Sequence, residues 1–246
     1  MESRGIDHLV LAVRDLGAAA AFYESLGFTL TPQAQHPFGT GNRLAQLQGG
    51  FLELLSVTEP DWIPKAGPGE FSFGAYNQDF IARREGMSMI ALQSDDWQAD
   101  RTDFESAGLT PAAPFSFGRK ARQPDDSEVE MGFDLTILPR PAAPDAVFFT
   151  CQHRHAPEHF YKPAYQDHAN GARRISKVII ESPDTAATAG FLSALGVDQS
   201  LFQIVDGEVE RLTGFEIATT DLDAVRQGST PIEAFGVTLR FCEEKD

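Results

Sequence analysis

The sequence predicts an α+β fold built from tandem βαβββ modules, and two observations lead to this prediction. First, one strand-then-helix pattern occurs three times along the chain with the same internal spacing. Second, each copy is followed by further apolar, strand-like runs before the next copy begins or the chain ends. A repeat of this kind means that one supersecondary unit is reused, so the repeat defines the organisation of the chain.

The spacing of the repeat can be counted from His8, Met89 and Lys177, which occupy equivalent positions. In each copy an Asp follows seven residues later and a Gly nineteen residues later. An Asp at the start of a helix accepts hydrogen bonds from the free N–H groups of the first turn. A Gly at its end takes the left-handed conformation without a Cβ penalty. The equivalent pairs are Asp15 with Gly27, Asp96 with Gly108, and Asp184 with Gly196.

Module 1 covers residues 5–57 and shows each expected element in order. Residues 6–13 form an apolar strand that carries a single His, and a helix follows because apolar residues recur at helical spacing after Asp15. Strands are expected at residues 28–31, 43–48 and 51–57. Gly49 and Gly50 between the last two are typical of a hairpin turn.

The other two copies repeat this order. Module 2, residues 86–152, has an expected strand at 87–93, a helix at 96–107, and strands near 113–119, 128–138 and 146–152. A degenerate third βαβββ module is expected over residues 173–246, with a strand at 175–181, a helix at 184–195, and strands near 201–205, 209–219 and 235–241.

Two segments fall outside the repeat. Residues 58–85 form an aromatic insertion rich in Gly and Pro, and residues 153–172 form a loop with four of the six histidines. Long loops of this kind are either lids over a site or covers over exposed core. We expect both to cap a cleft between modules 1 and 2.

Composition excludes several classes of partner. The chain has 246 residues, 42% of them hydrophobic, and a net charge of -16, which would repel nucleic acid. No apolar run approaches the roughly twenty residues that span a bilayer. The N-terminus leads directly into a strand pattern, so no signal peptide is expected. Cys151 and Cys242 lie in apolar runs and are interpreted as thiols in a reducing, cytoplasmic compartment.

The motifs resemble the vicinal oxygen chelate superfamily, which includes glyoxalase I, extradiol dioxygenases and bleomycin-resistance proteins. The segments HLVLAVRDLGAAAAFYESLGF, HPFGTGNR and FLELL are similar to bacterial glyoxalase-like proteins, and QHRHAPEHF with HANGA continues the likeness to about residue 172. Residues 173–246 resemble the superfamily only in the repeat spacing. The resemblance implies that paired modules curve into a half-barrel sheet that holds a divalent metal.

The resemblance also implies the metal ligands, one from the first and one from the fourth strand of each module. In module 1 these positions are His8 and Glu53. In module 2 Met89 replaces the histidine, and Gln152 is the candidate fourth-strand ligand if its face of the strand is the concave one; His153 or His155 are alternatives if the strand ends in a bulge. Imidazole and carboxylate ligands suit Zn, Fe, Mn or Ni, and the choice among them stays open.

Two clusters are candidates for substrate contact. The segment from His36 to Arg43 leads into a strand, and within it Thr40, Asn42 and Arg43 are candidate binding residues, with Arg43 able to clamp an anionic group. Glu158 is a further candidate after the last strand of module 2. The candidate general bases are His36 and His155, since imidazole titrates near neutral pH.

The sequence supports two functions. The first is a metal-dependent lyase or isomerase of glyoxalase-like type acting on a small substrate with vicinal oxygens. The second is a non-catalytic protein that binds a small molecule, for example an antibiotic, in an aromatic cleft. An odd third module leaves a sheet edge or face to be covered, so a homodimer is expected. That module could also serve only as an interaction surface.

Overall fold

A computed structural model describes residues 3–122, 128–227 and 230–244 of the chain. Module 1 contains β1 (Ile6–Ala12), α1 (Leu16–Ser25), β2 (Ala34–Gln35), β3 (Thr40–Leu47) and β4 (Gly50–Val57). The insertion contains the 3-10 helix η1 (Pro60–Trp62) and α2 (Phe73–Arg83). Module 2 contains β5 (Gly86–Ser94), α3 (Trp97–Ser106), β6 (Phe115–Arg122), β7 (Glu128–Leu138) and β8 (Val147–His153).

The C-terminal part begins with two short helices in the His-rich loop, α4 (Pro157–Phe160) and α5 (Pro163–Gln166). It continues with β9 (Ala172–Ser182), α6 (Thr185–Ala194), η2 (Gln199–Leu201), β10 (Phe202–Asp206), β11 (Arg211–Thr219), α7 (Leu222–Gln227), β12 (Ile232–Ala234) and β13 (Val237–Glu243). Within the described ranges, no helix has both the length and the apolar character that crossing a bilayer requires.

The repeated Asp residues are helix caps, as the spacing predicted. The carboxylate of Asp15 accepts from the N–H of Ala18, and Asp96 and Asp184 make equivalent contacts at the starts of α3 and α6. The three repeated glycines all have positive φ, between 67° and 90°. Local interactions therefore start and end all three helices in the same way.

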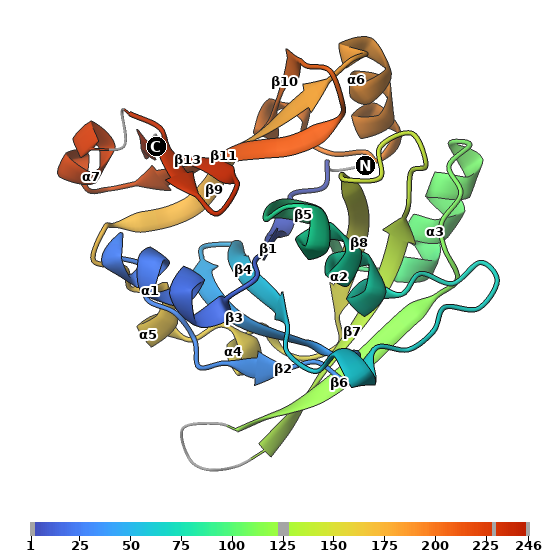
Figure 1. The fold of residues 1–246 in the computed structure, drawn as a ribbon, viewed down its shortest axis with the longest axis horizontal. Coiled ribbons are helices and arrows are strands. Elements are labelled where there is room, and N and C mark those ends of the chain that lie inside the picture. The colour runs from blue at the N-terminus through green and yellow to red at the C-terminus, as the bar shows by residue number, and fades with distance from the viewer. Residues whose placement is uncertain (1–2, 123–127, 228–229, 245–246) are drawn as a thin grey trace.

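Modules 1 and 2 join into one curved sheet of eight strands, in the order β2-β3-β4-β1-β5-β8-β7-β6 (Figure 1). Each first strand pairs in parallel with the fourth strand of its own module, β1 with β4 and β5 with β8. The two first strands, β1 and β5, pair antiparallel at the centre. This order confirms the predicted α+β fold of paired βαβββ modules in a half-barrel sheet.

One strand of module 1 differs from the prediction. Residues 28–31 are not part of a strand, and the short β2 at Ala34–Gln35 takes the edge position instead. Phe28 packs against Tyr23 and Phe241, with ring centroids 5.8 and 5.9 Å away. The apolar run that resembled a strand therefore fills the space between the helix and the C-terminal sheet.

The C-terminal sheet does not have the strand order of one βαβββ module, which corrects the expectation for residues 173–246. Its order is β10-β9-β11-β13-β12. Here β9 pairs in parallel with β10 and antiparallel with β11, and β11 pairs in parallel with β13. These are the pairings of β4-β1-β5-β8 in the large sheet. The C-terminal sheet is thus two shortened units, one starting at β9 and the other at β11.

The apolar face of the C-terminal sheet is covered by the large sheet and its helices (Figure 1). Phe235 contacts Phe22 of α1, and Phe191 of α6 contacts Phe148 of β8, with centroids 5.6 and 5.4 Å apart. This face is therefore buried within one chain. The homodimer stays a prediction.

Two of the repeated glycines provide a matched test of this packing. A Cβ at Gly27 would lie 2.9 Å from the backbone nitrogen of Asn170, whereas a Cβ at Gly196 would meet nothing within 4 Å. Gly196→Ala should cost only the left-handed backbone strain, about 1 kcal/mol. Gly27→Ala should cost roughly 2–3 kcal/mol, because the clash adds to the strain. Urea unfolding measures both, and equal losses would contradict the close approach of Asn170.

Candidate functional site

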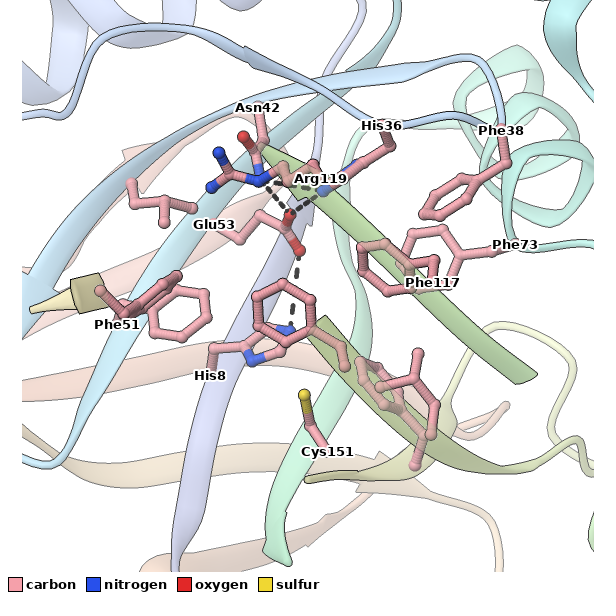
Figure 2. Close-up of a pocket in the computed structure, with 15 residues that line it drawn as sticks. His8, His36, Phe38, Asn42, Phe51, Glu53, Phe73, Phe117, Arg119 and Cys151 are labelled. Carbon is pink, nitrogen blue, oxygen red and sulfur yellow. Dashed lines mark hydrogen bonds and ion pairs between the residues drawn. The ribbon is translucent and has the colours of Figure 1, made fainter. Parts of the chain in front are cut away.

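A buried pocket lies on the concave face of the large sheet (Figure 2). Seven phenylalanine side chains line it, from strands of both modules, from the turn before β3, from α2 of the insertion and from α4 of the His-rich loop. The polar and sulfur-bearing residues of the wall are His8, His36, Asn42, Glu53, Arg119 and Cys151. The pocket is therefore an apolar chamber with a small polar group at one side.

His8 is positioned by an irregularity in β1. The pairing of β1 with β5 shifts register between Ile6 and His8, so Asp7 is an extra residue on its strand. A bulge of this kind re-aims side chains. The Nδ1 of His8 lies 2.5 Å from Oδ1 of Asp7, and its ring stacks on Phe51 at a centroid distance of 4.3 Å. The ring orientation is thus held from two sides.

The charge of Asp7 determines which nitrogen of His8 carries the proton. Burial alone would raise the pKa of Asp7, but hydrogen bonds from His153 and His8 outweigh it and lower the pKa to about 2. An ionised carboxylate only accepts hydrogen bonds, so Nδ1 of His8 is the donor. The Nε2 of His8 then faces Glu53, whose Oε2 is 3.7 Å away.

Glu53 is a buried carboxylate with few partners. Its Oε1 accepts a hydrogen bond of 2.6 Å from Nδ2 of Asn42. Burial raises its pKa, while the charge of His8, the Asn42 hydrogen bond and the charge of Arg119 act in the opposite direction. The Oδ1 of Asn42 is buried without a hydrogen-bond partner. Among the described residues, the Oδ1 of Asn42 and the Oε2 of Glu53 therefore accept no hydrogen bond.

His36 reaches the same group from the turn before β3. Its Nδ1 lies 2.9 Å from Oγ1 of Thr40, and its Nε2 lies 3.4 Å from Nδ2 of Asn42 and 3.8 Å from Oε1 of Glu53. Burial, with smaller contributions from Arg119 and His8, lowers the pKa of His36 to about 3. The imidazole is therefore neutral at physiological pH, and its Nε2 accepts from Asn42.

Four of the nine residues predicted from the sequence line the pocket together: His8, His36, Asn42 and Glu53. Thr40 does not line the pocket, and its Oγ1 is the hydrogen-bond partner of Nδ1 of His36. Side chains alternate along a strand, and Asn42 and Leu44 point into the pocket. Arg43 consequently points away, where it binds Glu24 and the carbonyl of Thr31.

The remaining predicted residues lie elsewhere. Gln152 is on the opposite face of β8, where its amide donates to the carbonyl of Asp95 and accepts from the N–H of Trp97 at the start of α3. Gln152 was a candidate ligand only if its face of β8 were the concave one, and it lies on the other face. His155 faces a separate surface groove, with its Nδ1 3.1 Å from the carbonyl oxygen of Gly132. Glu158 is exposed.

The register of the sheet identifies the true equivalents in module 2. Glu53 pairs with Val10, two residues after His8, and Phe149 pairs with Ala91, two residues after Met89. The ligand positions of module 2 are thus Met89 and Phe149, which offer neither a carboxylate nor an imidazole. The polar side of the pocket comes almost wholly from module 1.

Sequence reasoning missed three residues, Asp7, Cys151 and Arg119. Arg119 lies two residues after Phe117 on β6, so the alternation of the strand indicated that both share a face. Cys151 lies on the pocket side of β8, opposite to Gln152. No sequence signal marks Asp7, because the bulge that turns its side chain toward His8 depends on pairing with β5.

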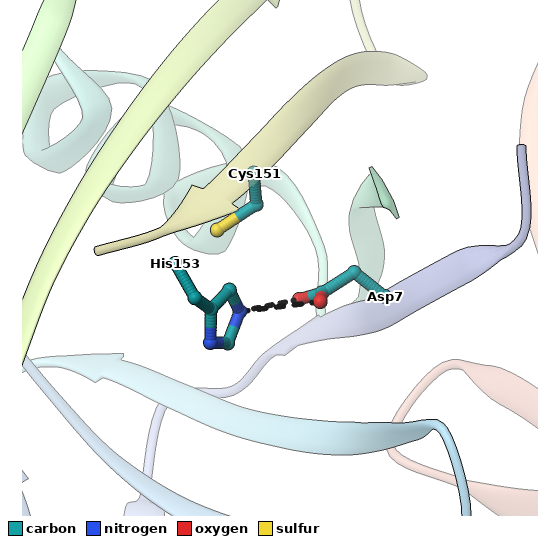
Figure 3. Close-up of side chains that lie close together, drawn as sticks. All are labelled: Asp7, Cys151 and His153. Atoms are coloured by element: carbon teal, nitrogen blue, oxygen red, sulfur yellow. Dashed lines mark hydrogen bonds and ion pairs between the residues drawn. The ribbon is translucent and has the colours of Figure 1, made fainter. Parts of the chain in front are cut away.

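Asp7 also belongs to a second group of potential ligands, with Cys151 and His153 (Figure 3). The ligand atoms of these three residues lie within 4.8 Å of one another. The Nε2 of His153 is 3.2 Å from Oδ2 of Asp7. Burial, together with the charges of Asp7, Glu53 and Asp134, raises the pKa of Cys151, so its thiol is protonated at neutral pH. Asp7 thus links this group to His8.

The burial of His36 predicts a pH dependence of stability. Its folded pKa of about 3 lies below the ordinary value of 6.5, so the unfolded chain binds more protons between these values. The free energy of unfolding should therefore fall as pH drops from 6.5 toward 3, by up to about 1.4 kcal/mol per pH unit from this group. His36→Gln should remove that part of the slope.

Denaturant titrations of the metal-free protein between pH 4 and pH 7 measure this slope. The exposed His159 provides the control, because its side chain stays in water in both states. His159→Gln should keep the slope of the wild type. A wild-type slope in His36→Gln would show that His36 is not buried as a neutral group.

Comparison with known proteins agrees with this architecture. A family model described as a glyoxalase-like domain matches residues 6–196. The fold is similar to a hypothetical protein from Staphylococcus aureus (TM-score 0.72, 17% identity, 97% of this chain and 99% of that chain covered). It is also similar to the Mn(II)-bound glyoxalase from Novosphingobium aromaticivorans (0.59, 14%, 100% and 83%). A third similar structure is a mutant of 4-hydroxymandelate synthase from Streptomyces coelicolor (0.54, 11%, 92% and 74%).

No curated protein sequence gives a significant match. At identities between 11% and 17%, the structural likenesses establish a shared fold. The family match covers most of the chain, including both modules that form the pocket. The protein therefore belongs to the glyoxalase-like domain family of the vicinal oxygen chelate superfamily.

Proposed function

We propose that the protein is a divalent-metal-dependent enzyme of lyase or isomerase type, acting on a small substrate with vicinal oxygens. The observation that carries this proposal is the approach of His8 Nε2 to Oε2 of Glu53 in a buried pocket, at 3.7 Å. This distance is too long for a hydrogen bond. An imidazole lone pair and a carboxylate facing one another without a hydrogen bond fit two ligands of one cation.

The donor chemistry near this pair also fits a metal. His36 lies beside Glu53 and is neutral, so its Nε2 could supply a third donor in place of its contact with Asn42. The hydrogen bond from His8 to Asp7 is the kind of support that metal-binding histidines have. The similar fold of an Mn(II)-bound glyoxalase adds support for a divalent ion. Zn, Fe, Mn and Ni all remain candidates.

When bound, the metal would supply Lewis-acid polarisation of the substrate's oxygens. The protein itself supplies orientation and exclusion of water. Asp7 holds the tautomer and ring angle of His8, and Asn42 holds Glu53. The phenylalanine walls shield the polar group from solvent, which strengthens electrostatic interactions inside the pocket. The Nε2 of His36 lies beside Glu53 and accepts from Asn42, and its lowered pKa makes it a weak base.

A second function, binding without catalysis, has its own supporting observation. Both ligand positions of module 2 are apolar, with Met89 and Phe149 where the first module has His8 and Glu53. A metal would then have protein ligands from module 1 only. The same aromatic chamber could hold an apolar small molecule, such as an antibiotic, without a metal.

Metal content separates these functions. Untagged protein analysed by plasma mass spectrometry should contain about one equivalent of a divalent metal, and His8→Ala and Glu53→Gln should each lose it. Cys151→Ser is the matched control, because it removes a ligand of the neighbouring Asp7, Cys151 and His153 group and leaves His8 and Glu53 intact. Metal lost only in Cys151→Ser would instead place the metal at the group formed by Asp7, Cys151 and His153. No metal after reconstitution with each candidate ion would favour the binding protein.

Asp7 should tune the metal affinity without contacting the ion held by His8. Asp7→Asn removes the charge that makes Nδ1 of His8 the donor, so the affinity should fall about 10- to 100-fold. Competition with a fluorescent chelator measures the change. Glu158→Gln, on the exposed surface, should leave the affinity unchanged. Unchanged affinity in a folded Asp7→Asn variant would argue against His8 as a ligand.

A further inference from the structure

We propose that Arg119 binds a carboxylate of the substrate, which makes the substrate a small 2-hydroxy or 2-oxo carboxylate with an aromatic or other apolar group. This inference rests on the proposed function, because it names the substrate class of the same pocket. Arg119 carries a positive charge for which the described residues of the sheet provide no hydrogen-bond or ion-pair partner.

Arg119 extends from β6 into the polar side of the pocket, near Asn42 and Glu53 (Figure 2). Among the residues that the structure describes, none forms a hydrogen bond or an ion pair with its guanidinium. Two arginines on or beside the same sheet are paired: Arg43 of β3 with Glu24, and Arg154, just after β8, with Asp134. Arg119 is thus a partly buried cation that retains its hydrogen-bonding capacity.

Glu53 is the nearest opposite charge, and it does not satisfy Arg119. One oxygen of Glu53 accepts from Asn42, and the other faces His8. Its influence on Arg119 is only through space, where it opposes the lowering of the Arg119 pKa by burial. An unpaired guanidinium held away from water is costly, so a ligand that brings an anion to this position gains the interaction that the protein lacks.

The charges of the occupied site favour the same kind of ligand. A divalent cation on His8 and Glu53 would leave an excess of positive charge, because Arg119 adds its charge to that of the ion and only the carboxylates of Glu53 and Asp7 oppose them. A carboxylate offsets this charge and matches the fork of donors on a guanidinium. With an oxygen on the adjacent carbon, the same ligand carries the vicinal oxygens that the proposed reaction needs.

The rest of the pocket indicates the other end of the substrate. Phe117 lies on the same face of β6 as Arg119, and its ring is stacked on Phe133 at 5.0 Å and edge-on to Phe38 at 5.1 Å. These rings offer flat and edge surfaces to an aromatic or aliphatic group. A charged group at Arg119 and an apolar group among the phenylalanines together describe the substrate class.

The test compares an acid with its neutral amide. Isothermal titration with 3-phenyllactate and 3-phenyllactamide, which have the same shape, should show tighter binding of the acid by wild-type protein. Arg119→Gln should weaken binding of the acid about 10- to 100-fold and leave the amide unchanged, and Arg119→Lys should restore part of the loss. Arg43→Gln, a change on the opposite face of the sheet, should behave as wild type.

Metal analysis of each sample keeps this proposal separate from the proposed function. If wild-type protein holds no metal but still prefers the acid through Arg119, the metalloenzyme fails and the carboxylate site stands. If metal is present and the acid and amide bind equally, or the acid does not bind, the carboxylate site is wrong and the metalloenzyme stands. A melting curve for each variant shows that it is folded, and a folded Arg119→Gln variant that binds the acid as wild type does also overturns the proposal.

Discussion

The antiparallel pairing of β1 with β5 is the interaction on which the pocket depends. It joins two modules into one curved sheet, and curvature places side chains from both modules around one chamber. The irregular register of the same pair leaves Asp7 as an extra residue, so its carboxylate reaches the ring of the adjacent His8. A single pairing thus builds the pocket and orients its most important imidazole.

The two modules contribute different chemistry to that pocket. Module 1 supplies His8, His36, Asn42 and Glu53, whereas module 2 supplies mainly phenylalanines and one guanidinium, Arg119. The pocket is therefore polar on one side and apolar on the other. Such an arrangement suits a substrate with an oxygen-rich end and an apolar end. The two modules do not supply a symmetric ligand set, because Met89 and Phe149 of module 2 occupy the positions of His8 and Glu53.

The C-terminal sheet repeats the central pairing of the large sheet. Strands β9 and β11 pair antiparallel as β1 and β5 do, and the outer strands are fewer. Its apolar face is used in packing against α1 and β8 through Phe235 and Phe191. This part of the chain stabilises the convex side of the large sheet, opposite to the proposed chemistry.

The sequence by itself determined the repeated units and their helix caps, and the family resemblance implied that His8 and Glu53 share one face. These features depend on interactions within a few residues and on the alternation of side chains along a strand. The family resemblance also identified the fold, which the strand order confirms. Asn42 and His36 were recognised as candidates because the turn that carries them leads directly into a strand of the same module.

Only the tertiary structure decided which face of β8 is concave, how Asp7 is turned, and that Arg119 joins the pocket. It also decided that residues 173–246 form two shortened units, since β11 pairs with β9 as a new first strand. Each of these features depends on which strands pair and in which register. Pairing joins segments far apart in the chain, so the local spacing that defines a helix cap or a strand carries no information about it.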